Sequence, residues 1–213
     1  KYQPMFLQDF EMDDKLLELI QILIKMDNLN ILFVGNSGCG KTSLITAIIR
    51  DYYDNMNYKD NVLYINTLKD QGISYYRNEV KTFCQTSTNI VGKKKIIVLD
   101  DLDVINEQSQ QVFRNFIDKY SHNVHFIASC TNTNKVIESI QSRMSTTKIK
   151  ALHTANLSKI LKRICKIENI SVEQEAEDFI LSISNNSVRI MINYLEKFKL
   201  LSSNITLDIA ISV

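Results

Sequence analysis

The sequence predicts an α/β fold, a parallel sheet between helices, followed by a small domain of three helices. Two observations predict it. Short apolar runs alternate with segments of helical periodicity as far as about residue 151, which is the pattern of a parallel sheet covered on both faces. Strand signals then stop, and the chain continues as helical segments joined by short polar turns. We therefore expect a core over residues 1–151 and a helical domain over residues 152–202.

The elements of the core are expected in strict alternation. Four apolar runs predict strands, and the third of these is continuous and ends in two acids, as is typical of a central parallel strand. The predicted strands are 31–34, 62–65, 96–99 and 124–129. The predicted helices are 13–26, 41–52, 73–83, 109–120 and 136–140. In the second domain, helices are predicted over 156–168, 172–184 and 188–201.

Composition excludes several classes of protein. The longest apolar runs are far too short to cross a bilayer. The four cysteines contain no C-x-x-C pair, and the three histidines are not spaced as metal ligands, so we expect reduced thiols and an intracellular protein. No Ser-His-Asp or Cys-His arrangement is suggested. The net charge is +1, so any binding of nucleic acid must depend on local basic patches.

A phosphate-binding motif follows the first predicted strand. Residues 35–42 match G-x-x-x-x-G-K-[ST] in full and lead directly into a helix. Glycines let the backbone N–H groups converge on phosphate oxygens, and the helix presents its positive end to the same anion. Lys41 is expected to neutralise the β- and γ-phosphates, and the Thr42 hydroxyl to ligate Mg²⁺. The predicted ATP-binding residues are Gly35, Asn36, Ser37, Gly38, Cys39, Gly40, Lys41, Thr42 and Ser43.

Two acids, Asp100 and Asp101, close the central strand. Ligands of open parallel sheets lie at the carboxyl ends of the strands, so both acids should face the triphosphate. We expect Asp100 to hold Mg²⁺ through water, and Asp101 to orient and deprotonate the attacking water. A solvated acidic turn is the alternative for each, and it weighs more for Asp101.

Five further segments identify a family resemblance. They are Lys1-Tyr2-Gln3-Pro4; residues 64–78 (YINTLKDQGISYYRN); Ser129-Cys130-Thr131-Asn132; Ser142-Arg143-Met144; and Ser187-Val188-Arg189. In this order they resemble the small subunits of replication factor C, the AAA+ ATPases of sliding-clamp loaders. The chain departs from the family pattern at Gln3 for Arg and at Met144 for Cys. A further departure is Asp101, where the family typically has Glu.

The resemblance implies a RecA-like AAA+ P-loop core and a helical lid. It implies that Pro4 lies near the adenine and that Thr131 or Asn132 is the sensor 1 residue close to the γ-phosphate. Arg143 would act in trans, at the ATP site of a neighbouring subunit, and Arg189 would be the sensor 2 residue that closes the lid. Residues 203–213 would begin a linker to a collar domain that the chain lacks.

The same resemblance implies contacts to DNA. In clamp loaders, basic residues at the starts of two helices follow the duplex backbone. Arg77 and Lys81 match the first helix, and Arg114 matches the second. An ordinary solvated helix charge is the alternative for each residue, and it weighs most for Lys81. Phosphate contacts that are weak singly become useful when a ring of subunits repeats them.

The sequence is thus identified as an ATP-binding subunit of a clamp loader, which uses ATP and Mg²⁺ to load a polymerase clamp onto primed DNA. The implied partners are sister subunits in a hetero-oligomeric ring, the sliding clamp and primed duplex DNA, with no membrane. The implied location is inside a cell, in the nucleus or at a site of viral replication. Two alternatives stay open: a regulatory or structural ATP-binding subunit with little turnover, favoured by Asp101, and another AAA+ ATPase such as an initiator or a Holliday-junction motor.

Overall fold

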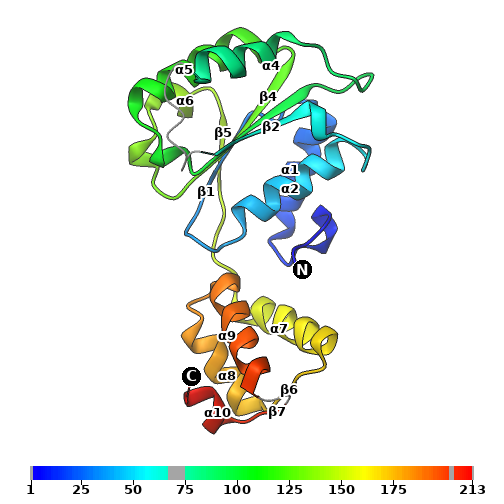
Figure 1. The fold of residues 1–213 in the computed structure, drawn as a ribbon, viewed down its shortest axis with the longest axis vertical. Helices are drawn as coiled ribbons and strands as arrows, with labels where there is room; N and C mark the ends of the chain where they lie inside the picture. Colours follow the sequence, from blue (N-terminus) through cyan, green and yellow to red (C-terminus); the bar gives the residue numbers. More distant parts are fainter. Residues whose placement is uncertain (1, 67–74, 202–203, 213) are drawn as a thin grey trace.

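The computed structural model describes residues 2–66, 75–201 and 204–212 of the chain. They form two parts, a sheet between two layers of helices and a smaller helical part (Figure 1). The N-terminal segment lies beside the boundary between them. The parallel α/β architecture that the sequence predicted is confirmed.

The sheet has five parallel strands in the order β2-β3-β4-β1-β5. Their bounds are β1 (Ile31–Val34), β2 (Val62–Asn66), β3 (Lys95–Asp100), β4 (Val124–Cys130) and β5 (Ser145–Lys148). Every strand runs in the same direction. The phosphate motif after β1 and the acids at the end of β3 therefore lie at the same end of the sheet, where the strands have their carboxyl ends.

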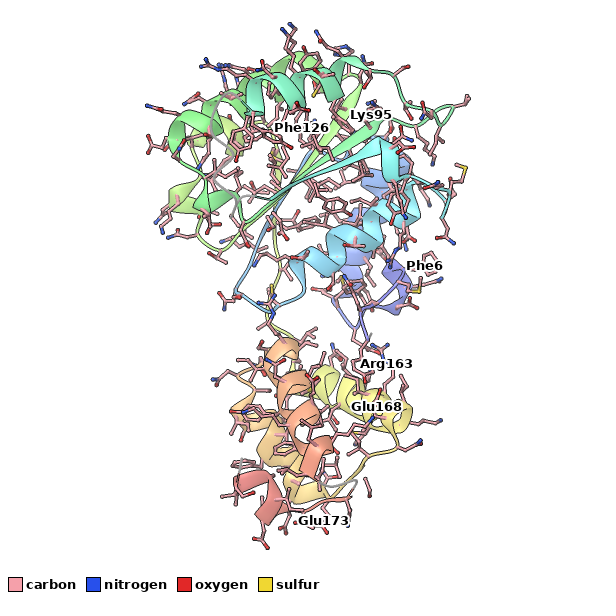
Figure 2. The ribbon with its side chains drawn as sticks, viewed as in Figure 1. Phe6, Lys95, Phe126, Arg163, Glu168 and Glu173 are labelled. Carbon is pink, nitrogen blue, oxygen red and sulfur yellow. The ribbon has the colours of Figure 1, made fainter. Side chains whose placement is uncertain are left out.

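Apolar side chains of the central strands alternate between two helical layers. Ile97 and Leu99 of β3 pack with α5 and α6, whereas Ile96 and Val98 pack with α1 and α2. The helices are α1 (Asp14–Lys25), α2 (Lys41–Tyr52), α4 (Lys81–Gln85), α5 (Glu107–Tyr120) and α6 (Glu138–Gln141). Phe126 of β4 is buried on the α5 side (Figure 2). Single 3-10 turns lie at Leu7–Asp9, Lys59–Asn61, Leu102–Val104 and Thr133–Lys135.

Three details of the core differ from the sequence-based expectation. β5 was not predicted, because its four residues are polar and their side chains are largely exposed at the sheet edge, so no apolar run marks it. The predicted helix 73–83 starts outside the described residues; within them, a π-helical turn at Tyr76–Val80 leads into α4. The short helix expected at 136–140 begins at Glu138, because Val136 and Ile137 have extended backbones.

The helical part contains α7 (Thr154–Glu168), α8 (Gln174–Ile183), α9 (Val188–Leu201) and α10 (Leu207–Ile211), with a small parallel pair β6 (Ser171–Val172) and β7 (Asn204–Ile205). Helical spacing buries one face of each of the three long helices around a common cluster. Ile205 and Ala210 are buried in the same cluster. The segment expected to begin a linker therefore packs onto the helical part, as far as it is described.

Three of the four cysteines are buried, and all four are free thiols. Burial raises the pKa of Cys84 to about 12 and that of Cys130 and Cys165 to about 11, so these thiols are protonated at neutral pH. Reduced, mostly buried thiols agree with the sequence prediction. None of the described helices has the length and apolar character needed to span a bilayer.

Candidate functional site

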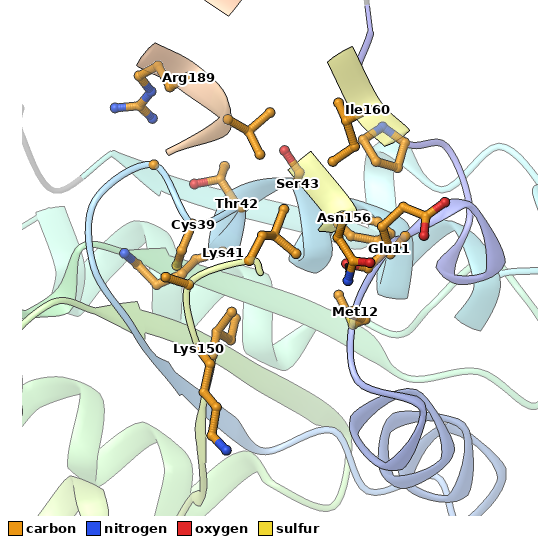
Figure 3. A pocket seen from close by; sticks show the side chains of 18 of the residues that line it. Glu11, Met12, Cys39, Lys41, Thr42, Ser43, Lys150, Asn156, Ile160 and Arg189 are labelled. Atoms are coloured by element: carbon orange, nitrogen blue, oxygen red, sulfur yellow. Dashed lines mark hydrogen bonds between the residues drawn. The ribbon is translucent and has the colours of Figure 1, made fainter. Parts of the chain in front are cut away.

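A cavity of about 790 Å³ lies where three segments meet: the phosphate-binding loop of residues 35–42, called the P-loop below, the N-terminal segment, and the helical part, called the lid below. Figure 3 shows Arg189 on the lid side of this cavity, with Cys39, Lys41 and Thr42 on the side of the core. The volume is within the range of small-molecule sites and is large enough for a nucleotide. Of the expected ATP-binding residues, the described lining includes the following: Pro4, Ser37, Gly38, Cys39, Gly40, Lys41, Thr42, Ser43 and Arg189.

The P-loop depends on glycine at two positions with positive φ. Gly40 caps α2 with φ of 96°, and Gly38 has φ of 78°. A Cβ on Gly38 would also lie 2.4 Å from Ser187 Oγ, just before α9 of the lid. Glycine at Gly38 therefore lets the loop turn and also lets it approach the lid closely.

Lys41 is the first residue of α2, and only 6% of its surface is exposed. Its ammonium group donates to the carbonyl oxygens of Gly35 at 2.7 Å and Asn36 at 3.1 Å. An ammonium has three N–H donors, so these two bonds leave one over. The loop thus holds a buried positive charge at the start of α2, against its own carbonyl groups and in the lining of the cavity.

Thr42 and Asp100 are brought together although 58 positions separate them. Thr42 Oγ1 donates to Asp100 Oδ2 at 2.8 Å, and Ser129 Oγ donates to the other oxygen, Oδ1, at 2.5 Å. Sequence reasoning gave Ser129 no role, although it opens the segment Ser129-Cys130-Thr131-Asn132. The parallel register would have found it, because Leu99 pairs with Ala128 and the next residues are Asp100 and Ser129.

Asp101 lines the cavity with a left-handed backbone, φ 54° and ψ 52°. Its N–H donates to Ser129 Oγ at 3.1 Å, so one serine organises both acids. Burial, and then the charge of Asp100, raise the pKa of Asp101 above its ordinary value, while Lys41 and Arg189 lower it. A carboxyl whose pKa is raised toward neutrality is better able to accept a proton from water.

Thr131 and Asn132 contact a different acid. Thr131 Oγ1 donates to Asp103 Oδ2 at 2.6 Å, and the N–H groups of Thr131 and Asn132 donate to the same oxygen at 3.1 and 3.0 Å. Burial alone would raise the pKa of Asp103, but these hydrogen bonds outweigh it and lower the pKa. The Asn132 side chain caps the next turn by accepting from Asn134 N at 2.9 Å. Neither Thr131 nor Asn132 belongs to the described lining of the cavity.

The N-terminal segment joins the lid to the core. Pro4 and Gln3 line the cavity beside apolar side chains of the core and of the lid, including Met12 and Ile160. Tyr2 is hydrogen-bonded to Glu168 at the end of α7. Pro4, Met12 and Ile160 offer apolar contacts to a flat base at this end of the cavity, beside the polar Glu11 and Asn156, and the lysine and arginine end is suited to phosphates.

Arg143 lies outside the described lining of the cavity. It follows α6, and its Nε donates to Asp118 Oδ1 on α5 at 2.5 Å. Its side chain is 29% exposed. The geometry therefore separates Arg143 from the P-loop of its own chain.

The three candidate DNA-contact residues lie on two helical segments that pack together. The rings of Tyr76 and Phe113, with centroids 5.0 Å apart, join the turn that carries Arg77 to α5, which carries Arg114. Arg77 and Lys81 are exposed on the helical stretch Tyr76–Gln85. Arg114 lies in the middle of α5 and not at its start, because α5 begins at Glu107.

Comparison with known proteins decides the family. Residues 31–151 match the model of the "ATPase family associated with various cellular activities (AAA)". A replication factor C small subunit of Methanococcus maripaludis is 30% identical over 214 residues, which cover the whole of this chain and 68% of that protein. The chain belongs to the replication factor C small subunit family of AAA proteins.

A second relative supports this family, and a solved structure has a similar fold. A replication factor C small subunit of Methanococcus vannielii is 32% identical over 206 residues, which cover 96% of this chain. The chain spans 65% of the length of that relative. Thermotoga maritima RuvB, described as a Holliday junction branch migration motor, has a similar fold, with a TM-score of 0.78 over 99% of this chain and 71% of that one. Its sequence identity is 14%, so it shows the fold alone.

Proposed function

We propose that this replication factor C family chain binds and hydrolyses ATP as one subunit of a sliding-clamp loader. The observation that carries the proposal is the convergence of Lys41 from the P-loop, Asp101 from the turn after β3 and Arg189 from the lid on one cavity. These groups come from three separate elements, and a triphosphate would bring all three into contact. Binding would therefore couple the lid to the core.

The residues present fit a magnesium ion. Thr42 Oγ1 and the Asp100 carboxylate lie within 2.8 Å of each other at the start of α2, and a hydroxyl with a carboxylate is the usual protein share of a Mg²⁺ site beside phosphates. The ion, when bound, would offset charge on the phosphate oxygens. Ser129 orients Asp100 for this role by donating to its second oxygen.

The remaining chemistry falls to the chain's own residues. The third N–H of the Lys41 ammonium would donate to a phosphate oxygen, beside its two carbonyl contacts. Asp101, close to Lys41 and with a raised pKa, would orient the attacking water and accept its proton. Arg189 would bring positive charge from the lid. Thr131 and Asn132 would act at the γ-phosphate only after leaving their contacts with Asp103.

The partners of the proposed activity are sister subunits, a ring-shaped clamp and primed duplex DNA, inside a cell. Arg143 would complete the ATP site of the adjacent subunit, because it lies away from its own cavity. Arg77, Lys81 and Arg114 would contact the duplex backbone through phosphates. Such contacts weaken steeply with added salt and are independent of base sequence.

Clamp loading by a reassembled complex tests this function. The chain is combined with its sister subunits, the clamp and a primed circular DNA, and clamp retained on the DNA is measured with ATP and with a non-hydrolysable analogue. We expect loading that requires this chain and ATP. A complex that assembles and binds ATP, yet loads no clamp, would contradict the proposal.

The second candidate is an ATP-binding subunit with little turnover. Asp101 favours it, because a side chain one methylene shorter than Glu must bring the attacking water nearer to the backbone. Single-turnover hydrolysis in the assembled complex separates the two. A burst of product at this subunit's site supports the ATPase, and tight binding without product supports the structural role.

A further inference from the structure

One carboxylate on α5 contacts the arginine to which the proposed function gives a role in trans. Asp118 lies in the last turn of α5, and its Oδ1 accepts from Arg143 Nε at 2.5 Å. Arg143 Nη1 donates to the carbonyl oxygen of Ser139 in α6 at 2.7 Å and lies 3.4 Å from Ser142 Oγ. Two sides of the guanidinium are thus held by its own chain.

The third nitrogen of the Arg143 guanidinium, Nη2, has no contact of this kind among the described residues. A guanidinium has five N–H donors in a rigid plane, and these contacts use those on Nε and Nη1. Arg143 Nη2 donates to no group among the residues that the structure describes. Because the plane is rigid, holding Nε and Nη1 also sets the direction of Nη2.

We propose that Asp118 is a positioning residue for Arg143, which aims the Nη2 edge of the guanidinium at the phosphoryl group bound by the adjacent subunit. The inference rests on the proposed function, because it requires Arg143 to act in trans. A long side chain that is oriented beforehand loses less freedom when it reaches the phosphate, and small errors of placement at a reacting centre are costly in rate.

Asp118 also contacts Arg114, and the distances decide which arginine it serves. Arg114 Nε lies 3.4 Å from Asp118 Oδ2, without the geometry of a hydrogen bond, compared with 2.5 Å for Arg143. The pKa of Asp118 is lowered first by the hydrogen bond from Arg143, then by the charge of Arg143, and last by the charge of Arg114. Arg143 is therefore the principal partner of Asp118, and Arg114, which also donates to Asn115 Oδ1 at 3.0 Å, is the more loosely held of the two arginines.

Exposure separates this role from a structural one. The Asp118 side chain is 43% exposed, and ion pairs between exposed side chains contribute little to stability. Removing the carboxylate should therefore leave folding and assembly unchanged. We expect the loss to affect only the orientation of the Arg143 side chain.

The test uses the complex reassembled with its sister subunits. Asp118→Ala should slow hydrolysis at the adjacent site by roughly ten- to hundredfold, with the affinity for ATP, the KM, the DNA affinity and the melting temperature unchanged. Asp118→Glu should restore part of the rate. Glu107→Ala removes an exposed acid from the other end of the same helix and should have no effect.

A double variant identifies the path of the effect. If Asp118 acts through Arg143, Asp118→Ala combined with Arg143→Ala should be no slower than Arg143→Ala alone. A further slowing, or a loss of DNA affinity with Asp118→Ala, would overturn the inference. If Arg143→Ala slows the adjacent site and Asp118→Ala does not, the positioning role fails alone. If Arg143→Ala itself has no effect, the trans role fails, and the positioning role with it.

Discussion

The two ends of the sheet use polar and charged side chains in opposite ways. At the amino end, the Asp27 carboxylate accepts from Tyr52 Oη at 2.7 Å and from His125 Nε2 at 2.9 Å, and lies 3.0 Å from Lys94 Nζ. His125 Nδ1 in turn accepts from the backbone N–H of Leu29 at 3.4 Å. Each polar group of this network has its partner within the chain.

At the carboxyl end, the polar groups face a cavity. Lys41 rests on carbonyl oxygens, and Asp101 has a raised pKa because burial and Asp100 act on it together. One oxygen of the nearby Asp103, Oδ1, is buried without a hydrogen bond among the described residues. A network that satisfies itself stabilises a fold, whereas one left incomplete is available to a ligand. The same contrast separates substitutions that should affect activity from those that should affect stability.

The largest expected effect is that of Asp101→Asn on hydrolysis. If the Asp101 carboxylate accepts the proton of the attacking water, the Asn amide that replaces it cannot do so. Single-turnover hydrolysis in the assembled complex should then slow by about 10²–10⁴-fold while ATP still binds. Asp27→Asn makes the same change at the amino end and should lower stability without slowing the folded protein. Unchanged turnover in Asp101→Asn would exclude Asp101 as the base.

Lys41→Ala should weaken ATP binding by roughly 1.5–3 kcal/mol, because it removes a charge-assisted contact to phosphate. Titration with a fluorescent ATP analogue measures the change. Lys94→Ala deletes the same charge at the amino end, where Lys94 pairs with Asp27, and should leave ATP affinity unchanged. If wild type and Lys41→Ala bind the ATP analogue with equal affinity, the assignment of Lys41 as a phosphate-binding residue is wrong.

His125→Phe should lower the free energy of unfolding by about 1–3 kcal/mol, because it leaves the buried N–H of Leu29 and one contact of Asp27 without a partner. Denaturant unfolding measures this effect, and ATP titration of the same variant is the control. A loss of ATP affinity while the variant stays folded would show that the two ends of the sheet are coupled.

The smallest effect concerns pH. Burial lowers the pKa of His125 below its ordinary value of 6.5, although Asp27 raises it in part. A group with a lowered pKa in the folded state binds its proton more readily in the unfolded chain. Its contribution to stability should thus fall as pH drops below about 6.5, by at most about 1.4 kcal/mol per pH unit. The difference between wild type and His125→Phe, measured at several pH values, isolates this term, and a constant difference would contradict it.

Sequence reasoning located the carboxyl end better than the amino end. The phosphate motif and the strand before it share one short segment, so β1 and α2 were predicted with the observed bounds. Local pattern could not reveal Asp27 and His125, which are 98 positions apart and meet only through the sheet. β5 was not predicted for a related reason, because a polar edge strand is defined by its pairing with β1 and not by its own composition.

The site shows the same limit. Motifs identified Thr42 and Asp100 correctly as neighbours, but they assigned Thr131 and Asn132 to the phosphate without the competing contact with Asp103. Family resemblance supplies which residue types occur, whereas hydrogen-bond partners depend on backbone geometry. Ser129 illustrates the difference, because only strand register places it beside Asp100.

The contact between Gly38 and Ser187 has a mechanical consequence. The P-loop and the start of α9 touch at a point where even one methyl group would not fit. A closer approach at that point would first require the Ser187 side chain to move. Replacing Gly38 by any other residue should therefore separate the loop from the start of α9, and so alter the cavity from a position that contributes no side chain to it.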